Sequence, residues 1–215
     1  MKFKNYLNES YSNISDITSY ELNKLINKDC KYYLKLIKDT TPLYRGMDIP
    51  IKIGKKDVRQ DRESLGMDQD VADALNVWLK DNNHTVRNKS VIATGDLEHT
   101  QMFGAKSYFI FPMGKFNYTW IKTKDINIPD DRNWNTFLLT GMFGDDMYDM
   151  RIAQRKYGTK EDMEKIFTTF ITTNKGFDIA QRNGYEIWMD CKSYYFVDVD
   201  SYYWLEREQE FTGFA

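Results

Sequence analysis

The sequence predicts an α+β fold, in which helices occur early in the chain and strands dominate its later part. Apolar residues recur at helical spacing over residues 18–38 and again after Asp68. Short aromatic and β-branched runs follow from residue 90 onward. Helices and strands do not alternate regularly, as they would in a parallel βαβ sheet. We therefore expect residues 18–215 to form one domain, preceded by a flexible N-terminal segment, residues 1–17.

The first predicted helix covers residues 18–38 and gives the fold its N-terminal helix. Thr18 and Glu21 have the spacing of a capping box. Its apolar face consists of Leu22, Leu25, Ile26, Cys30, Tyr33, Leu34 and Ile37. The helix ends at residues 39–42, because the residue before a proline disfavours the helical conformation. A second helix is expected after Asp68 as its N-cap, a short one between Asp96 and Gly104, and a further one over residues 159–174.

Six short strands are expected, at residues 43–47, 90–94, 107–111, 116–121, 186–189 and 194–199. Residues 116–121 are expected to pair with 107–111, and residues 186–189 with 194–199 as a final hairpin. The remaining segments, residues 48–66 and 175–184, are expected to be loops. Residues 125–157 have no single dominant pattern.

Composition narrows the class of protein. The formal net charge of −2 supplies no general attraction to nucleic acid, and residues 52–56 are the densest basic cluster. The two cysteines, Cys30 and Cys191, fit buried thiols in a reducing compartment better than a disulfide framework. No apolar run approaches the ~20 residues that span a bilayer, and no secretory signal pattern occurs. We expect an intracellular, soluble protein without a membrane partner.

Several common site motifs are absent from the sequence. It contains no glycine-rich phosphate loop and no Gly-x-Gly-x-x-Gly dinucleotide motif. Two histidines and two isolated cysteines do not have the spacing of a zinc site, so no metal is expected. No Gly-x-Ser-x-Gly sequence supports serine hydrolase chemistry.

Three strand-like segments each carry polar residues among hydrophobic ones. In chain order these are Arg45, the hydroxyls Ser90 and Thr94, and Glu186. An arginine offers a rigid, permanently charged fork for a diphosphate. Hydroxyls can bind ribose, and a carboxylate can stabilise a positively charged ribose as a glycosidic bond breaks. Together they suit NAD as a ligand.

The order of these segments resembles the mono-ADP-ribosyltransferase superfamily, including ADP-ribosyltransferase-like proteins of tailed bacteriophages. Residues 44–46 (Tyr-Arg-Gly) resemble the first motif of that superfamily, and residues 87–94 resemble the second, a Ser/Thr-x-Ser/Thr sequence. Residues 103–112 resemble the following helix-to-strand passage. Residues 183–187 resemble the strand with the catalytic glutamate, after a target-recognition loop at 175–182. The resemblance implies a split β-sheet and transfer of ADP-ribose from NAD, as co-substrate, to a macromolecule, a protein rather than a nucleic acid.

The resemblance also implies residue roles. Glu186 takes the catalytic position. The residues implied to bind NAD are Arg45, Gly46, Ser90, Thr94, Tyr108 and Phe109. The middle motif is longer than Ser-x-Ser, so Ser90 and Thr94 both remain candidates for its hydroxyl. Gly184 stands where protein-modifying members often carry Glu or Gln, which leaves the acceptor open.

Simpler interpretations and other functions remain beside this one. Arg45 could be a surface arginine, Ser90 and Thr94 ordinary strand residues, and Glu186 a charge that protects a sheet edge. With water as the acceptor, the protein would be an NAD glycohydrolase. A non-catalytic virion or binding protein on the same scaffold is the third alternative.

Residues 1–10 resemble the short capsid-targeting leaders of tailed-phage head proteins, which are cleaved after a Leu-x-Glu sequence. Leu7-Asn8-Glu9 fits that pattern. This resemblance implies packaging in a phage virion and action on host factors in the host cytoplasm. The alternative is an ordinary flexible terminus.

Overall fold

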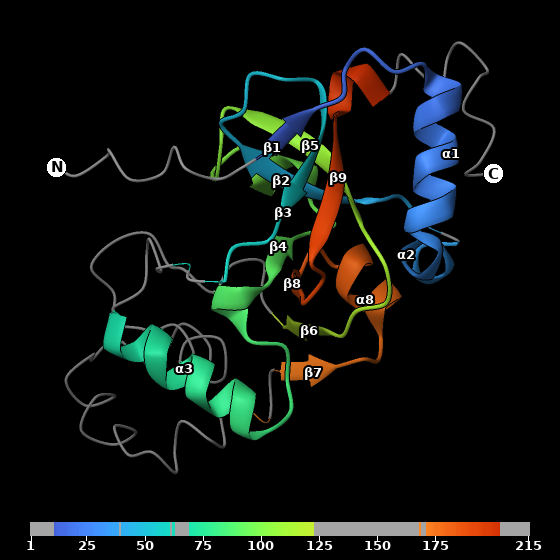
Figure 1. Ribbon diagram of the computed structural model, residues 1–215. Coiled ribbons are helices and arrows are strands. Elements are labelled where there is room, and N and C mark those ends of the chain that lie inside the picture. The colour runs from blue at the N-terminus through green and yellow to red at the C-terminus, as the bar shows by residue number, and fades with distance from the viewer. Residues whose placement is uncertain are drawn as a thin grey trace, which may run out of the picture.

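The protein has an α+β fold with two antiparallel sheets (Figure 1). The computed structural model describes residues 11–38, 40–60, 62, 69–122, 168 and 171–202. The first sheet consists, in spatial order, of β1 (Tyr11–Asn13), β3 (Ile53–Asp57), β9 (Ser193–Asp198), β5 (Lys106–Pro112) and β2 (Leu43–Met47). The second consists of β4 (Val91–Ala93), β8 (Glu186–Met189), β6 (Tyr118–Ile121) and β7 (Ile171–Thr173). The described helices are α1 (Ser19–Asp29), α2 (Lys31–Leu36), α3 (Gln69–Asp81), the 3₁₀ helix η1 (Arg87–Lys89), α4 (Leu97–Thr100) and α8 (Phe177–Arg182).

The N-terminal helix begins as predicted but is divided in two. Thr18 and Glu21 form the predicted capping box, with Glu21 N–H donating to Thr18 Oγ1 at 3.2 Å and Thr18 N–H to Glu21 Oε2 at 2.9 Å. Cys30 separates α1 from α2, with φ −109° and ψ 20°. Its thiol donates to the Phe111 carbonyl oxygen at 3.3 Å. This contact with β5 accompanies the break, which apolar periodicity alone does not reveal.

One face of the five-stranded sheet packs against α1 and α2 through aromatic side chains. Tyr33 of α2 meets Phe111 of β5 edge-on, with ring centroids 6.2 Å apart. Tyr195 of β9 donates its hydroxyl to Asp29 at the end of α1, at 2.8 Å. Figure 1 shows α1 and α2 on the same side of β9. This side holds much of the buried aromatic core.

The sheet contains two strands that the sequence did not predict. Residues 53–57 were expected in a loop, but they form β3, which pairs with both β1 and β9. Glycine and lysines give this segment little intrinsic strand preference, so its neighbours supply the pairing. The sheet also extends into the predicted N-terminal segment through β1. Residues 1–10 and the expected N-cap Asp68 lie outside the described residues.

Both predicted hairpins are wrong, for one shared reason. β5 pairs with β2 and β9, whereas β6 pairs with β7 and β8. β8 likewise pairs with β4 and β6, and β9 with β3 and β5. At 113–117 and again at 190–192 the chain passes from one sheet to the other. The short connections are typical of hairpins, but here they cross between sheets.

Residues 171–182 also differ from the prediction. Residues 171–173 were expected at the end of a helix and instead form β7, in keeping with their β-branched side chains. Residues 177–182 were expected in a loop and instead form α8, whose buried residues are Phe177, Ala180 and Gln181. The rest of the helix predicted over 159–174 lies outside the described residues, apart from Thr168, as does 125–157. The other predicted strands and helices are confirmed, with bounds that differ by a few residues.

Candidate functional site

The two sheets meet between β2 and β4. Tyr44 and Thr94 exchange two backbone hydrogen bonds, from Tyr44 N–H to Thr94 O at 2.8 Å and from Thr94 N–H to Tyr44 O at 3.0 Å. The next residue of β2 is Arg45, whose Nη1 donates to the carbonyl oxygen of Ile92 in β4. The structure therefore brings the first and second sequence motifs together, and we call this region the sheet junction.

Glu186 is the first residue of β8, the strand that pairs with β4. It is only 4% exposed. Its Oε1 accepts a hydrogen bond from Arg87 Nε at 3.0 Å and another from Trp188 Nε1 at 2.6 Å. Because strand residues alternate between faces, Glu186 and Trp188 share one face of β8. Two donors at one oxygen suit an ionised carboxylate and fix its orientation.

The two candidate hydroxyls of the middle motif bond to backbone. Ser90 is fully buried and donates to the carbonyl oxygen of Arg87 at 3.0 Å. Thr94 donates to the carbonyl oxygen of Gly184 at 2.8 Å and accepts from the backbone N–H of Asp96 at 3.1 Å. Thr94 is the one at the sheet junction. Arg87, in the same region, contacts Glu186, although the sequence prediction gave it no role.

Two glycines of the motifs stand where a neighbouring residue leaves no room for a side chain. A Cβ on Gly46 would lie 2.1 Å from the carbonyl oxygen of Thr100. Gly184 has φ +67°, and a Cβ there would lie 2.8 Å from the Cβ of Asp96. With this backbone, residue 184 cannot carry a long side chain without strain.

The aromatic residues predicted to contact NAD lie in the core. Tyr108 and Phe109 are consecutive in β5, so their side chains lie on opposite faces of the sheet. Tyr108 donates its hydroxyl to the carbonyl oxygen of Ile49 at 2.6 Å. The ring of Phe109 packs against those of Tyr44 and Tyr202, with centroids 4.8 and 4.3 Å away. The structure does not bring Tyr108 and Phe109 together at one site.

Two further cations lie near the sheet junction. Arg62 donates its backbone N–H to the carbonyl oxygen of Asn88, the residue after Arg87, at 3.2 Å. Burial, with Arg45, Arg87 and Arg59 nearby, lowers the pKa of Arg62 to about 9. Burial, with Arg62 and Arg59 nearby, also lowers the pKa of Lys56 to about 8. Both groups remain protonated at neutral pH.

Sequence reasoning missed Arg62 and Lys56 because both fall in the stretch expected to be a solvated loop. Tyr194 of β9, fully buried, is opposite Lys56 in the sheet register. Burial raises the pKa of Tyr194, while Arg45 and Arg62 beside it act in the opposite direction. The local sequence contains no signal for this convergence, which depends on how β3 and β9 pair.

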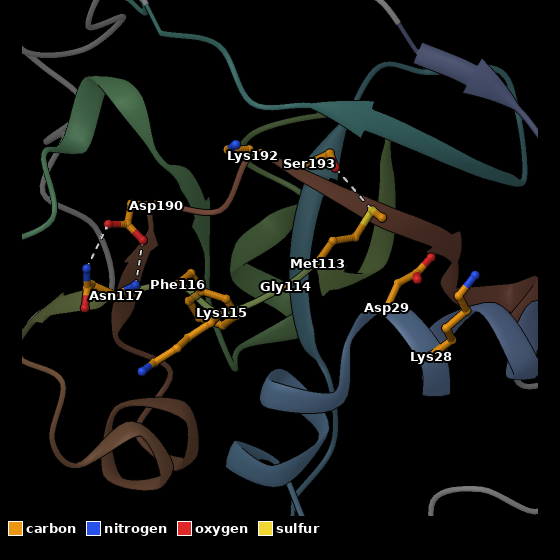
Figure 2. A pocket seen from close by; sticks show the side chains of 10 residues that line it. All are labelled: Lys28, Asp29, Met113, Gly114, Lys115, Phe116, Asn117, Asp190, Lys192 and Ser193. Carbon is orange, nitrogen blue, oxygen red and sulfur yellow. Dashed lines mark hydrogen bonds between the residues drawn. The ribbon is translucent and has the colours of Figure 1, made fainter.

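A separate hollow of about 890 Å³ lies beyond the other end of β8 (Figure 2). Its lining includes Lys28, Lys115, Lys192 and two aspartates, Asp29 and Asp190. Asp190 accepts hydrogen bonds from Asn117 N–H at 2.6 Å and from its side-chain amide at 3.2 Å. Asp190 follows Glu186 by four residues along an extended strand, about 13 Å away. This hollow is therefore distinct from the sheet junction.

The part of the chain that the structure describes has no group of three or more His, Cys, Asp or Glu side chains placed to hold a metal ion. None of its helices is long and apolar enough to cross a membrane. Comparison of the chain with protein-family models, curated proteins and solved structures finds no match.

Proposed function

We propose that this protein is an NAD-dependent mono-ADP-ribosyltransferase that transfers ADP-ribose to a macromolecular acceptor and releases nicotinamide. One observation carries the proposal: Arg45, Thr94 and Glu186 lie on or directly beside the neighbouring strands β2, β4 and β8, at the sheet junction. The split β-sheet of the superfamily places its three motifs on three such strands. The acceptor that we propose is a protein rather than a nucleic acid.

The chemistry assigns a role to each group. The bond between the anomeric carbon of the ribose and the nicotinamide nitrogen breaks, and its electron pair neutralises the pyridinium ring. The ribose becomes positively charged, as in glycoside hydrolysis. The Glu186 carboxylate stabilises this charge and accepts a hydrogen bond from a ribose hydroxyl. The acceptor then bonds to the anomeric carbon and loses its proton.

Arg87 and Trp188 prepare Glu186 for this role. Both donate to Oε1, so the carboxylate is held in one orientation. A preorganised charge acts more strongly in a buried site than in water, because little reorganisation is needed when the reaction occurs. Arg45, whose Nε is buried and has no hydrogen-bond acceptor among the described residues, fits the diphosphate of NAD.

The test is NAD turnover by wild type and Glu186→Gln, with nicotinamide release measured directly and macromolecular transfer followed with a labelled NAD. The expected loss in Glu186→Gln is on the order of 10²–10³ in rate, the usual effect of removing one such group. Glu98→Gln is the matched control, since Glu98 is exposed on α4. Equal turnover by wild type and Glu186→Gln, or none by wild type, would contradict the proposal.

A second candidate function is an NAD glycohydrolase, with water as the acceptor. Its support is Gly184, where positive φ and the contact with Asp96 exclude the Glu or Gln that often directs the acceptor in related enzymes. Nicotinamide release without any labelled macromolecule would favour this function. Tight NAD binding without turnover would favour a non-catalytic binding protein.

The biological setting is part of the same proposal. We place the enzyme in the host cytoplasm, acting on host factors after delivery in a phage virion. Its support is the leader-like Leu7-Asn8-Glu9, which lies outside the described residues. Mass spectrometry of virion proteins tests it, because packaging would leave a chain whose N-terminus begins after Glu9.

A further inference from the structure

At the sheet junction, two half-buried arginines each have one buried guanidinium nitrogen without a hydrogen-bond acceptor. These atoms are Arg45 Nε and Arg62 Nη1, and no described residue accepts a hydrogen bond from either. Arg45 does donate through Nη1 to Ile92. Leaving a buried donor unpaired is unfavourable, and more so when the donor is charged. Charged donors kept at such a cost point to an anionic ligand.

Three segments of the chain contribute to this cluster. Arg45 belongs to β2, Arg87 to η1, and Arg62 to the segment after β3. The backbone bond from Arg62 to Asn88 holds Arg62 beside η1. Tyr194, buried in β9, lies beside both Arg45 and Arg62. The arginines are thus brought together by tertiary structure rather than by sequence proximity.

The charges of this cluster are not balanced by its own carboxylate. Arg87 is paired with Glu186, whereas Arg45 and Arg62 have no ion pair to a described carboxylate. Lys56 and Arg59 take part in further interactions. The surplus of positive charge is therefore that of Arg45 and Arg62. A diphosphate that joins two nucleosides carries one negative charge on each phosphoryl group, which matches this surplus.

We propose that Arg62 is a phosphate-binding residue, and that it and Arg45 together hold the diphosphate of a dinucleotide. Arg62 lies outside the three motifs of the superfamily resemblance. A guanidinium presents parallel N–H donors to a phosphoryl group, which a lysine does not. The identity of the diphosphate as that of NAD rests on the proposed function, but the binding of the anion does not.

The test measures binding of ADP-ribose, which carries the diphosphate but lacks the nicotinamide, by titration calorimetry. Arg62→Gln is expected to weaken binding by about 10- to 100-fold, the usual effect of losing hydrogen bonds to a charged group. Lys55→Gln is the matched control. It also removes one unit of positive charge, but Lys55 lies on the face of β3 opposite to Lys56 and the arginine cluster. Arg62→Lys should give an intermediate loss, since it keeps charge without the fork.

Inorganic pyrophosphate and adenosine show whether the diphosphate or the adenosine part of ADP-ribose provides the affinity. Pyrophosphate should compete with ADP-ribose in wild type and compete less well in Arg62→Gln. Wild type that binds adenosine as tightly as ADP-ribose, or Arg62→Gln that binds ADP-ribose as tightly as Lys55→Gln, would overturn the proposal. Circular dichroism checks that each variant is folded. If Arg62→Gln is not folded, Arg62→Lys takes its place in the comparison with Lys55→Gln.

The outcomes for Arg62 and for catalysis are distinguishable. Loss of ADP-ribose binding in Arg62→Gln, together with no NAD turnover by wild type, would keep the phosphate site and reject the transferase. NAD turnover by wild type, together with unchanged ADP-ribose binding in Arg62→Gln, would keep the transferase and reject this role of Arg62.

Discussion

The two faces of the five-stranded sheet are both buried, but they bury different chemistry. On the face toward α1 and α2, Phe109, Phe111 and Tyr195 contact other aromatic or hydrogen-bonding side chains. On the other face, Arg45 and Lys56 are held beside the phenol of Tyr194. The first face buries aromatic rings, which favour burial, whereas the second also buries apolar residues such as Phe196 and Ile110 but places cations, which resist burial, beside them.

This difference suggests that the face toward α1 and α2 serves folding stability, whereas the cations of the other face serve ligand binding. Burying an aromatic ring is favourable in itself, so the first face needs no other explanation. Burying cations near one another is unfavourable, and replacing such groups with apolar residues is often neutral or stabilising. Charges retained at that cost are good candidates for ligand contacts. We expect substitutions on the two faces to affect different measurements.

The largest expected effect is on folding stability, from a substitution on the face of the five-stranded sheet toward α1 and α2. Phe111→Ala should lower the free energy of unfolding by about 4 kcal/mol, because it opens a cavity between Tyr33 and Tyr202. ADP-ribose binding should be unchanged under conditions where the variant is folded. Chemical denaturation measures the first and calorimetry the second. Tyr20→Ala, at a residue 68% exposed, is the control and should change stability little. A selective loss of binding in Phe111→Ala would break the separation of the two faces.

The next effect concerns the ion pair at the sheet junction. Arg87→Met should destabilise the protein by about 3 kcal/mol, because it leaves the buried Glu186 carboxylate without this cation. The double variant Arg87→Met/Glu186→Gln should recover most of that loss, since the uncompensated charge is gone. Denaturation of both variants and of Glu186→Gln completes a double-mutant cycle. Additive effects in that cycle would show that the pair is not coupled.

A third prediction concerns the backbone at the sheet junction. Gly184→Ala should destabilise by about 2 kcal/mol, from its left-handed conformation and from the contact of the new Cβ with Asp96. Gly114→Ala is the matched control: its φ is +71°, but a Cβ there would meet nothing within 4 Å. The control should lower the free energy of unfolding by only about 1 kcal/mol, the cost of placing an alanine in the left-handed conformation. Equal losses in the two variants would remove the argument that packing excludes a side chain at 184.

The sequence predicts the strands that carry Arg45 and Glu186, because each is a short apolar run whose pattern is local. It does not predict which strands pair: the connections after β5 and β8 are short enough for hairpins, yet each crosses to the other sheet. β3 escapes prediction because its residues gain strand structure only from their neighbours.

Contacts between distant segments are also what the sequence does not predict at the candidate site. Arg87 lies inside a predicted motif, but its bond to Glu186 depends on the path of η1. Arg62 lies in a charged stretch typical of a solvated loop, and its burial depends on contacts with distant segments. The residue types of the motifs are readable from sequence, whereas the charge environment around them is not.

The smallest expected effect is the pH dependence of folding stability that Lys56 causes on the face with Arg45 and Tyr194. The pKa of Lys56 falls from its ordinary value to about 8 in the folded protein. Between about pH 8 and the ordinary lysine value the unfolded chain binds more protons than the folded one, so folding stability rises with pH. From pH 7 to pH 9, wild type should gain about 1 kcal/mol relative to Lys56→Met, which lacks this titration. Denaturation of both proteins at the two pH values measures the difference, in which the tyrosines common to both cancel. No change with pH would mean that Lys56 is solvated like an ordinary surface lysine, and the contrast between the two faces would then rest on the arginines alone.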